Sequence, residues 1–117
     1  MSTRSPITTH ILDTSLGQPA QGVAVALEAW DSGKTWKLLA KGVTDRDGRV
    51  ADLLPAGTSL VPGVYRLMFD TGAYYKRQKV DGFYPCVPVM FEVKDPAQHY
   101  HVPLLLNPFG YATYRGS

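Results

Sequence analysis

The sequence lacks the features that identify several large classes of protein. It has one cysteine, Cys86, among 117 residues, so no disulfide bond can form within the chain. No stretch approaches the ~18 apolar residues of a membrane span, and the N-terminus has no apolar segment of the kind that a secretory signal needs. These absences exclude a disulfide framework and favour a protein of the reducing cytoplasm that does not act in a membrane.

The chain also lacks a large excess of charge of either sign. The chain has 12 basic and 10 acidic residues, for a formal net charge of +2, and no window collects a run of like charges. This balance argues against nucleic acid as a partner. A GxSxG elbow, a phosphate-cradling glycine loop and a paired-carboxylate signature are absent too, so covalent hydrolase and nucleotide-binding functions find no support.

What the chain does contain is typical of an all-β domain. Nine prolines and eleven glycines divide it into short segments rich in Val, Leu, Tyr and Phe. Eight short strands predict a two-sheet β-sandwich, and the length and the lack of a linker predict a single domain over residues 1–117. The expected strands are Ile7–Asp13, Val23–Asp31, Trp36–Thr44, Arg49–Leu54, Val64–Asp70, Cys86–Lys94, Tyr100–Leu106 and Tyr111–Gly116.

One segment departs from the strand pattern. The stretch "DTGAYYKRQKVDG" begins with a possible helix cap at Asp70 or Thr71 and continues through residues that tolerate a helix. It stops before Asp81-Gly82. We expect one short helix there.

The three histidines are the main candidates for chemistry. His10, His99 and His101 all lie on or beside predicted strands. In an extended chain His99 and His101 share one face, and Tyr100 and Val102 share the other. The pair is compatible with a metal site or with ordinary hydrogen-bonded histidines. A metal site needs three or four ligands at fixed geometry, and only Asp95 lies close to the pair in sequence, so we expect no metal.

Arg49 is the next candidate. It directly follows the "DRDG" turn, whose Asp47-Gly48 is the sharpest hairpin signal in the chain. A guanidinium at the start of a strand suits a planar, oxygen-rich ligand. The alternative is a surface arginine paired with Asp45 or Asp47, and Arg46 and Arg66 have the same ordinary interpretation.

The C-terminal segment alternates as a strand does. Its many large side chains are unusual for a chain end, and aromatic and leucine side chains on an outer face indicate a homo-oligomer. The two faces carry Tyr111, Thr113 and Arg115 on one side and Ala112, Tyr114 and Gly116 on the other.

Several stretches together resemble one enzyme family. The ending "HVPLLLNPFGYATYRGS" resembles the C-terminal signature of the 5-hydroxyisourate hydrolases, the transthyretin-like enzymes of urate breakdown, and "YRGS" is its most specific part. The stretches "ITTHILDTSLGQPAQGVAVALEA", "TDRDGRV", "PGVYRLMFDTGAYY" and "FYPCVPVMFEV" match in the same order. Asn107 departs from the family, which usually has Ser there, and Cys86 has no assigned role.

The resemblance implies an eight-stranded sandwich with one short helix, assembled as a homotetramer (a dimer of dimers) with its sites at the dimer-dimer interface. It implies hydrolysis of 5-hydroxyisourate to 2-oxo-4-hydroxy-4-carboxy-5-ureidoimidazoline, by histidine-activated attack of water on a ring carbonyl, without a cofactor. Two alternatives are a non-catalytic carrier of a planar aromatic ligand and a purely structural sandwich that self-associates.

The resemblance also assigns residues, and His99 lies outside its motif. The implied catalytic residues are His10, Arg49, His101 and Ser117. The implied substrate-binding residues are His10, Arg49, Tyr114, Arg115 and Gly116. The role implied for Ser117 uses its hydroxyl and a free terminal carboxylate, and we therefore expect the chain to end at Ser117.

Overall fold

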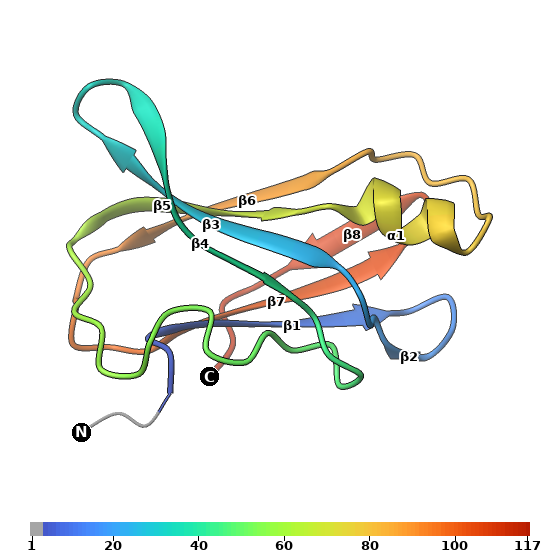
Figure 1. The fold of residues 1–117 in the computed structure, drawn as a ribbon, viewed down its shortest axis with the longest axis horizontal. Helices are drawn as coiled ribbons and strands as arrows, with labels where there is room; N and C mark the ends of the chain where they lie inside the picture. Colours follow the sequence, from blue (N-terminus) through green and yellow to red (C-terminus); the bar gives the residue numbers. More distant parts are fainter. Residues whose placement is uncertain (1–3) are drawn as a thin grey trace.

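Alternating apolar and polar residues form two layers of strands in the computed structural model, which describes residues 4–117 (Figure 1). Sheet A contains four strands in the order β2-β1-β7-β8, and sheet B contains four in the order β4-β3-β5-β6. The strands of sheet A are β1 (Ile7–Asp13), β2 (Gln18–Pro19), β7 (Tyr100–Asn107) and β8 (Gly110–Thr113). The strands of sheet B are β3 (Ala24–Asp31), β4 (Thr35–Val43), β5 (Gly63–Phe69) and β6 (Val87–Val93). The predicted sandwich is confirmed.

The core fills the space between the two sheets. Strand β1 alternates between buried and half-buried residues, and β7 buries Tyr100, Val102, Leu104 and Leu106. Because successive side chains of a strand point to opposite faces, each strand gives one set to the core and one to an outer face. A fully buried residue such as Leu104 contributes roughly 1.5–3 kcal/mol of hydrophobic stabilisation.

The predicted helix is confirmed as α1 (Thr71–Arg77), at one end of the sandwich (Figure 1). Asp70 caps it, since its Oδ1 accepts a hydrogen bond from the Ala73 N–H at 3.1 Å. The Tyr74 hydroxyl donates to Oδ2 of the buried Asp13 at 2.7 Å and so ties the helix to the end of β1. No helix in residues 4–117 is long and apolar enough to cross a membrane.

The predicted strand Arg49–Leu54 is wrong. The buried residues of this segment are Val50, Leu53 and Leu54, and their spacing is not the every-second-residue spacing of a strand. The backbone of Asp52 has a φ of 53°, outside the extended region. The segment therefore packs as an irregular loop.

One additional strand and the end of another also differ from the prediction. The short strand β2, which pairs with Leu12 and Asp13, was not predicted, because two residues are too few to show a periodic pattern. Strand β8 ends at Thr113, and an isolated bridge between His101 and Gly116 continues its pairing in the same register.

Candidate active site

The outer face of sheet A gathers the histidines. Strands β1 and β7 are parallel neighbours, with Thr8 opposite His101 and His10 opposite Pro103. Since residues i and i+2 of a strand share a face, His99 lies on the same side as these four. The prediction that His99 and His101 share one face and that Tyr100 and Val102 share the other is confirmed, and the structure buries Tyr100 and Val102.

Arg49 is brought to this face by the turn before it. Asp45 closes the turn, because its Oδ1 accepts from the Arg49 N–H at 3.1 Å. Gly48 has a φ of 77°, and a Cβ there would lie 2.3 Å from the Ile11 carbonyl oxygen. Only glycine therefore lets the turn lie against β1. The next residue, Arg49, forms an isolated backbone bridge with His10.

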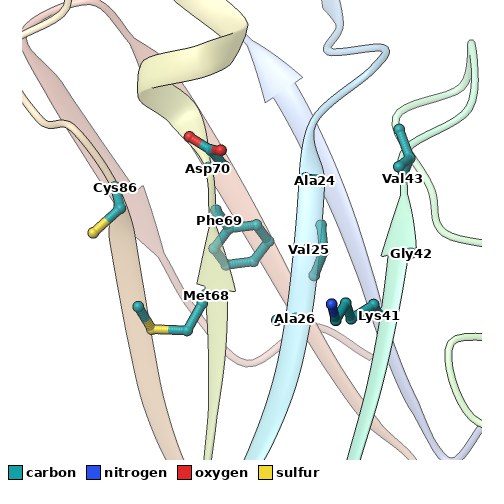
Figure 2. A pocket seen from close by; sticks show the side chains of 10 residues that line it. All are labelled: Ala24, Val25, Ala26, Lys41, Gly42, Val43, Met68, Phe69, Asp70 and Cys86. Atoms are coloured by element: carbon teal, nitrogen blue, oxygen red, sulfur yellow. The ribbon is translucent and has the colours of Figure 1, made fainter. Parts of the chain in front are cut away.

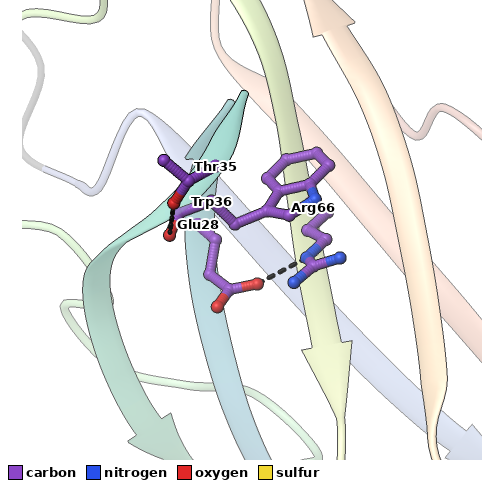
Figure 3. Close-up of polar contacts among 4 residues, drawn as sticks. All are labelled: Glu28, Thr35, Trp36 and Arg66. Atoms are coloured by element: carbon purple, nitrogen blue, oxygen red, sulfur yellow. Dashed lines mark hydrogen bonds and ion pairs between the residues drawn. The ribbon is translucent and has the colours of Figure 1, made fainter. Parts of the chain in front are cut away.

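The side chain of Arg49 is not paired with either aspartate of its turn. Within residues 4–117 the ion pair is that of Arg66, whose Nε donates to Oε1 of Glu28 at 2.5 Å on the outer face of sheet B (Figure 3). The Arg66 guanidinium also lies 4.2 Å from the centroid of the Trp36 ring. The ordinary structural interpretation therefore holds for Arg66 and not for Arg49.

The C-terminal tail packs directly on His101. The Gly116 N–H donates to the His101 carbonyl at 2.9 Å. A Cβ on Gly116 would lie 2.6 Å from Cδ2 of the His101 ring, so the glycine allows the tail to touch the imidazole. Ser117 follows at the wall of the adjoining cavity.

Two other residues of the tail, Tyr114 and Arg115, do not line the cavity that Ser117 borders. The Arg115 guanidinium lies 4.6 Å from the centroid of the Tyr100 ring and donates to Oε1 of Gln98 at 2.8 Å. Tyr114 is 58% exposed and, with Arg115, lines another hollow beside β6 and β7, which His101 also borders. Within this chain Arg115 holds the tail in place, and substrate binding by Tyr114 and Arg115 stays a prediction.

Thr8 connects the two neighbouring histidines. Its Oγ1 lies 2.9 Å from Nε2 of His99 and 2.8 Å from Nδ1 of His101. The two rings are nearly parallel, with centroids 6.4 Å apart and planes at 15°. Sequence reasoning missed Thr8, although its position two residues before His10 on a strand places it on the same face.

These residues border an open cavity of about 440 Å³. Three of the predicted site residues, Arg49, His101 and Ser117, line it together. His10 lies beside it on β1 and is close enough to influence the charge of His101. The complete lining is Arg4, Ser5, Thr8, Thr9, Asp45, Arg49, Val50, Ala51, Asp52, His99, His101 and Ser117.

The surroundings of His101 and His99 favour the neutral form of both imidazoles. Burial lowers the pKa of His101 from its ordinary value, and the charges of Arg49 and the other two histidines lower it further, against a hydrogen bond to the backbone of Thr8. Burial and the nearby Arg4 likewise lower the pKa of His99. A neutral imidazole is available as a base at neutral pH. No three His, Cys, Asp or Glu side chains within residues 4–117 form a metal-ligand group.

A second hollow lies on the outer face of sheet B (Figure 2). Its volume is also about 440 Å³, but its wall is almost entirely apolar. Met68 and Val43 border it, and Cys86 lies at its edge beside β5 (Figure 2). The lining of this hollow includes Lys41 and Asp70 but no histidine or arginine, so it has neither an imidazole base nor a guanidinium to hold an oxyanion.

Known proteins resemble this chain along nearly all of its length. The model of the HIUase/Transthyretin family matches residues 7–116. A 5-hydroxyisourate hydrolase of Salmonella typhimurium is 48% identical over 112 residues, which cover 95% of this chain and 80% of that protein.

Solved structures agree with this match. The 5-hydroxyisourate hydrolase of Klebsiella pneumoniae has a TM-score of 0.80 at 37% identity, covering 95% of this chain and 98% of that one. A sea bream transthyretin in complex with thyroxine has a TM-score of 0.89 at 35% identity, covering 96% of this chain and 95% of that one. With its two-sheet sandwich, the one helix found in residues 4–117 and this match over 7–116, the chain belongs to the HIUase/Transthyretin family.

Proposed function

We propose that this protein hydrolyses 5-hydroxyisourate to 2-oxo-4-hydroxy-4-carboxy-5-ureidoimidazoline in urate degradation, in the cytoplasm and without a cofactor. The observation that carries the proposal is the cavity of about 440 Å³ in which His101, with its lowered pKa, lies with Arg49, which forms no ion pair within residues 4–117. Ligand cavities measure about 300–1,000 Å³, so the volume suits a small bicyclic molecule. The relatives named 5-hydroxyisourate hydrolase support the same substrate.

The histidines activate water. 5-Hydroxyisourate is a bicyclic imide whose six-membered ring opens when water attacks a ring carbonyl. His10 and His101 act as the base and its partner: one imidazole takes a proton from water as the new C–O bond forms. General-base catalysis of this kind typically contributes on the order of 10²- to 10⁴-fold to the rate.

Arg49 stabilises the oxyanion that follows. Its guanidinium is a permanent cation with fixed donors, and it also orients the oxygens of the substrate. When the ring C–N bond breaks, the nitrogen leaves with the electron pair and receives the proton held by the imidazolium. The carbonyl re-forms and the histidine is neutral again, so the enzyme is unchanged at the end of the cycle.

We also propose a homotetramer, a dimer of dimers, in which the outer faces of sheet A meet. Strands β6 and β8 are the edges of their sheets and have unpaired sides in the single chain, which favours pairing with another copy. The cavity is open, and partner subunits would close it and border the exposed Tyr114. Ser117 and Gly116 then stand at the wall of an intersubunit site.

A carrier of a planar aromatic ligand is the second candidate, because a transthyretin with thyroxine bound has the same fold. The decay of freshly made 5-hydroxyisourate, followed by its absorbance, separates the two functions. A hydrolase accelerates the decay in proportion to protein concentration. A carrier or a structural protein leaves it at the uncatalysed rate, and that result would overturn the proposed function.

A further inference from the structure

The Thr8 hydroxyl lies between two ring nitrogens but has only one proton to donate. Its distances to Nε2 of His99 and Nδ1 of His101 are 2.9 and 2.8 Å, both ordinary hydrogen-bond lengths. Two hydrogen bonds need two protons, and a threonine hydroxyl supplies one. At least one of the two ring nitrogens that face Thr8 therefore carries a proton, so the tautomers of the two rings are coupled.

Only some of the coupled states leave His101 able to act as a base. If Thr8 donates to Nδ1 of His101, the neutral ring carries its own proton on Nε2. The lone pair of Nδ1 is then occupied by the hydrogen bond, and neither ring nitrogen is free to take a proton from water. If Nδ1 of His101 donates to Thr8, Nε2 keeps its lone pair. The Thr8 proton can then go to Nε2 of His99, which satisfies all three groups.

We propose that Thr8 is a positioning residue which holds a proton on Nδ1 of His101, leaves Nε2 free as the catalytic base, and links His101 to His99. This inference rests on the proposed hydrolysis. The structure supports the arrangement in two ways: Thr8 and His101 are opposite each other in the parallel register of β1 and β7, and the tail at Gly116 packs against the His101 ring. The His101 ring thus lies between the Thr8 hydroxyl, which bonds to it, and Gly116, which packs against it.

The link also provides a route for the proton. When Nε2 of His101 accepts a proton from water, the ring becomes positive beside Arg49, which disfavours the charge. Nδ1 can release its proton to the Thr8 oxygen as the Thr8 hydroxyl proton passes to Nε2 of His99. One proton enters and one is displaced along the chain, so the positive charge moves to the half-exposed His99 and returns by the reverse path.

The first test compares three threonine variants by steady-state hydrolysis of 5-hydroxyisourate. Thr8→Val keeps the side-chain shape without the hydroxyl and should lower kcat about 10- to 100-fold while KM changes less than about threefold. Thr8→Ser restores the hydroxyl and should recover most of the rate. Thr14→Val, the matched control, removes the hydroxyl that donates to the Leu106 carbonyl beyond the far end of β1 and should retain wild-type kcat.

The results distinguish a positioning role of Thr8 from a role in stabilising the fold alone. A Thr8→Val enzyme within about twofold of wild type, or a Thr8→Ser enzyme no better than Thr8→Val, overturns the inference. His99→Ala should lower kcat only about threefold, and adding it to Thr8→Val should cost nothing more, because both changes break the same link. Additive losses would contradict the link.

The second test needs no activity, so it separates this inference from the proposed function. Long-range ¹H–¹⁵N NMR of the histidine rings at pH 7.5 should show the Nδ1–H tautomer for His101 in the wild type and its loss in Thr8→Val. An Nε2–H tautomer for His101 in the wild type overturns the assignment. A wild type that has the Nδ1–H tautomer but does not hydrolyse 5-hydroxyisourate would refute the function and leave the positioning role intact.

Discussion

The two outer faces of the sandwich each contain a hollow of about 440 Å³, yet they have opposite chemistry. On sheet A the cavity contains Arg49, which forms no ion pair within residues 4–117, and His101 with a lowered pKa. On sheet B the hollow is apolar, and the nearby Arg66 is neutralised by Glu28 and covered by Trp36. Cavity size therefore does not distinguish the two hollows, and the presence in one lining of histidines and of an arginine outside the ion pair found in residues 4–117 does.

We expect the largest effect from removing the histidines on the outer face of sheet A. His10→Ala and His101→Ala should each lower kcat/KM for 5-hydroxyisourate by roughly 10²- to 10⁴-fold, because general-base catalysis is lost. Stopped-flow absorbance on freshly made substrate measures the loss. Both variants keeping more than about a tenth of the activity would contradict the assignment of these histidines.

The two arginines give a matched pair. Arg49→Met should lower kcat/KM by about 10²- to 10³-fold, since it removes a cation placed for the oxyanion. Arg66→Met should leave kcat/KM within about twofold and lower the melting temperature, because it leaves Glu28 without its partner on a half-buried surface. Equal losses of activity from both substitutions would contradict a catalytic role that belongs to Arg49 and not to Arg66.

The pH profile should show the charge of the sheet A cavity. The base must be neutral and the pKa of His101 is lowered, so kcat/KM should fall as the pH drops through a midpoint below 6.5. In Arg49→Met the midpoint should rise, because one cause of the lowered pKa is removed, while Arg66→Met should not move it. Asp45, Asp52, Arg4, His10 and His99 also face this cavity or influence its charge.

The free energy of unfolding should also decrease as the pH falls. A histidine with a lowered pKa in the folded state binds fewer protons than the unfolded chain below about pH 6.5. The free energy of unfolding should therefore be highest above that pH and decrease as the pH falls through it. Urea titrations at pH 7.5 and 5.5 measure the difference, and a protein more stable at pH 5.5 would contradict the lowered values.

The smallest expected effect concerns the tail. Gly116→Ala should lower kcat about tenfold, because its Cβ would meet Cδ2 of His101 at 2.6 Å and push the ring or the tail aside. Gly110→Ala on β8 is the control, since a Cβ there meets only Asn107 at an ordinary 3.8 Å. The kcat of the two purified variants is compared with wild type. An unaffected Gly116→Ala would mean that the tail does not position His101.

Much of this arrangement follows from local sequence patterns. The two-residue period placed His101 and Tyr100 on opposite faces of β7, and the pair Asp70 and Thr71 marked the start of α1, which Asp70 caps. The turn ending at Gly48 was recognised, but the strand expected after it was not formed. The spacing of Leu53 and Leu54 already differed from a strand pattern, although short apolar runs rarely decide between a strand and a packed loop.

The sequence by itself therefore determined the strand periods, the helix cap and the tight turn, because these depend on backbone preferences and on neighbours a few residues away. Only the tertiary structure decided that Thr8 meets His101, 93 residues later, and that Arg49 lies beside His10 and not against its own aspartates. Such contacts depend on the register between distant strands, and that register is set by how the whole core packs.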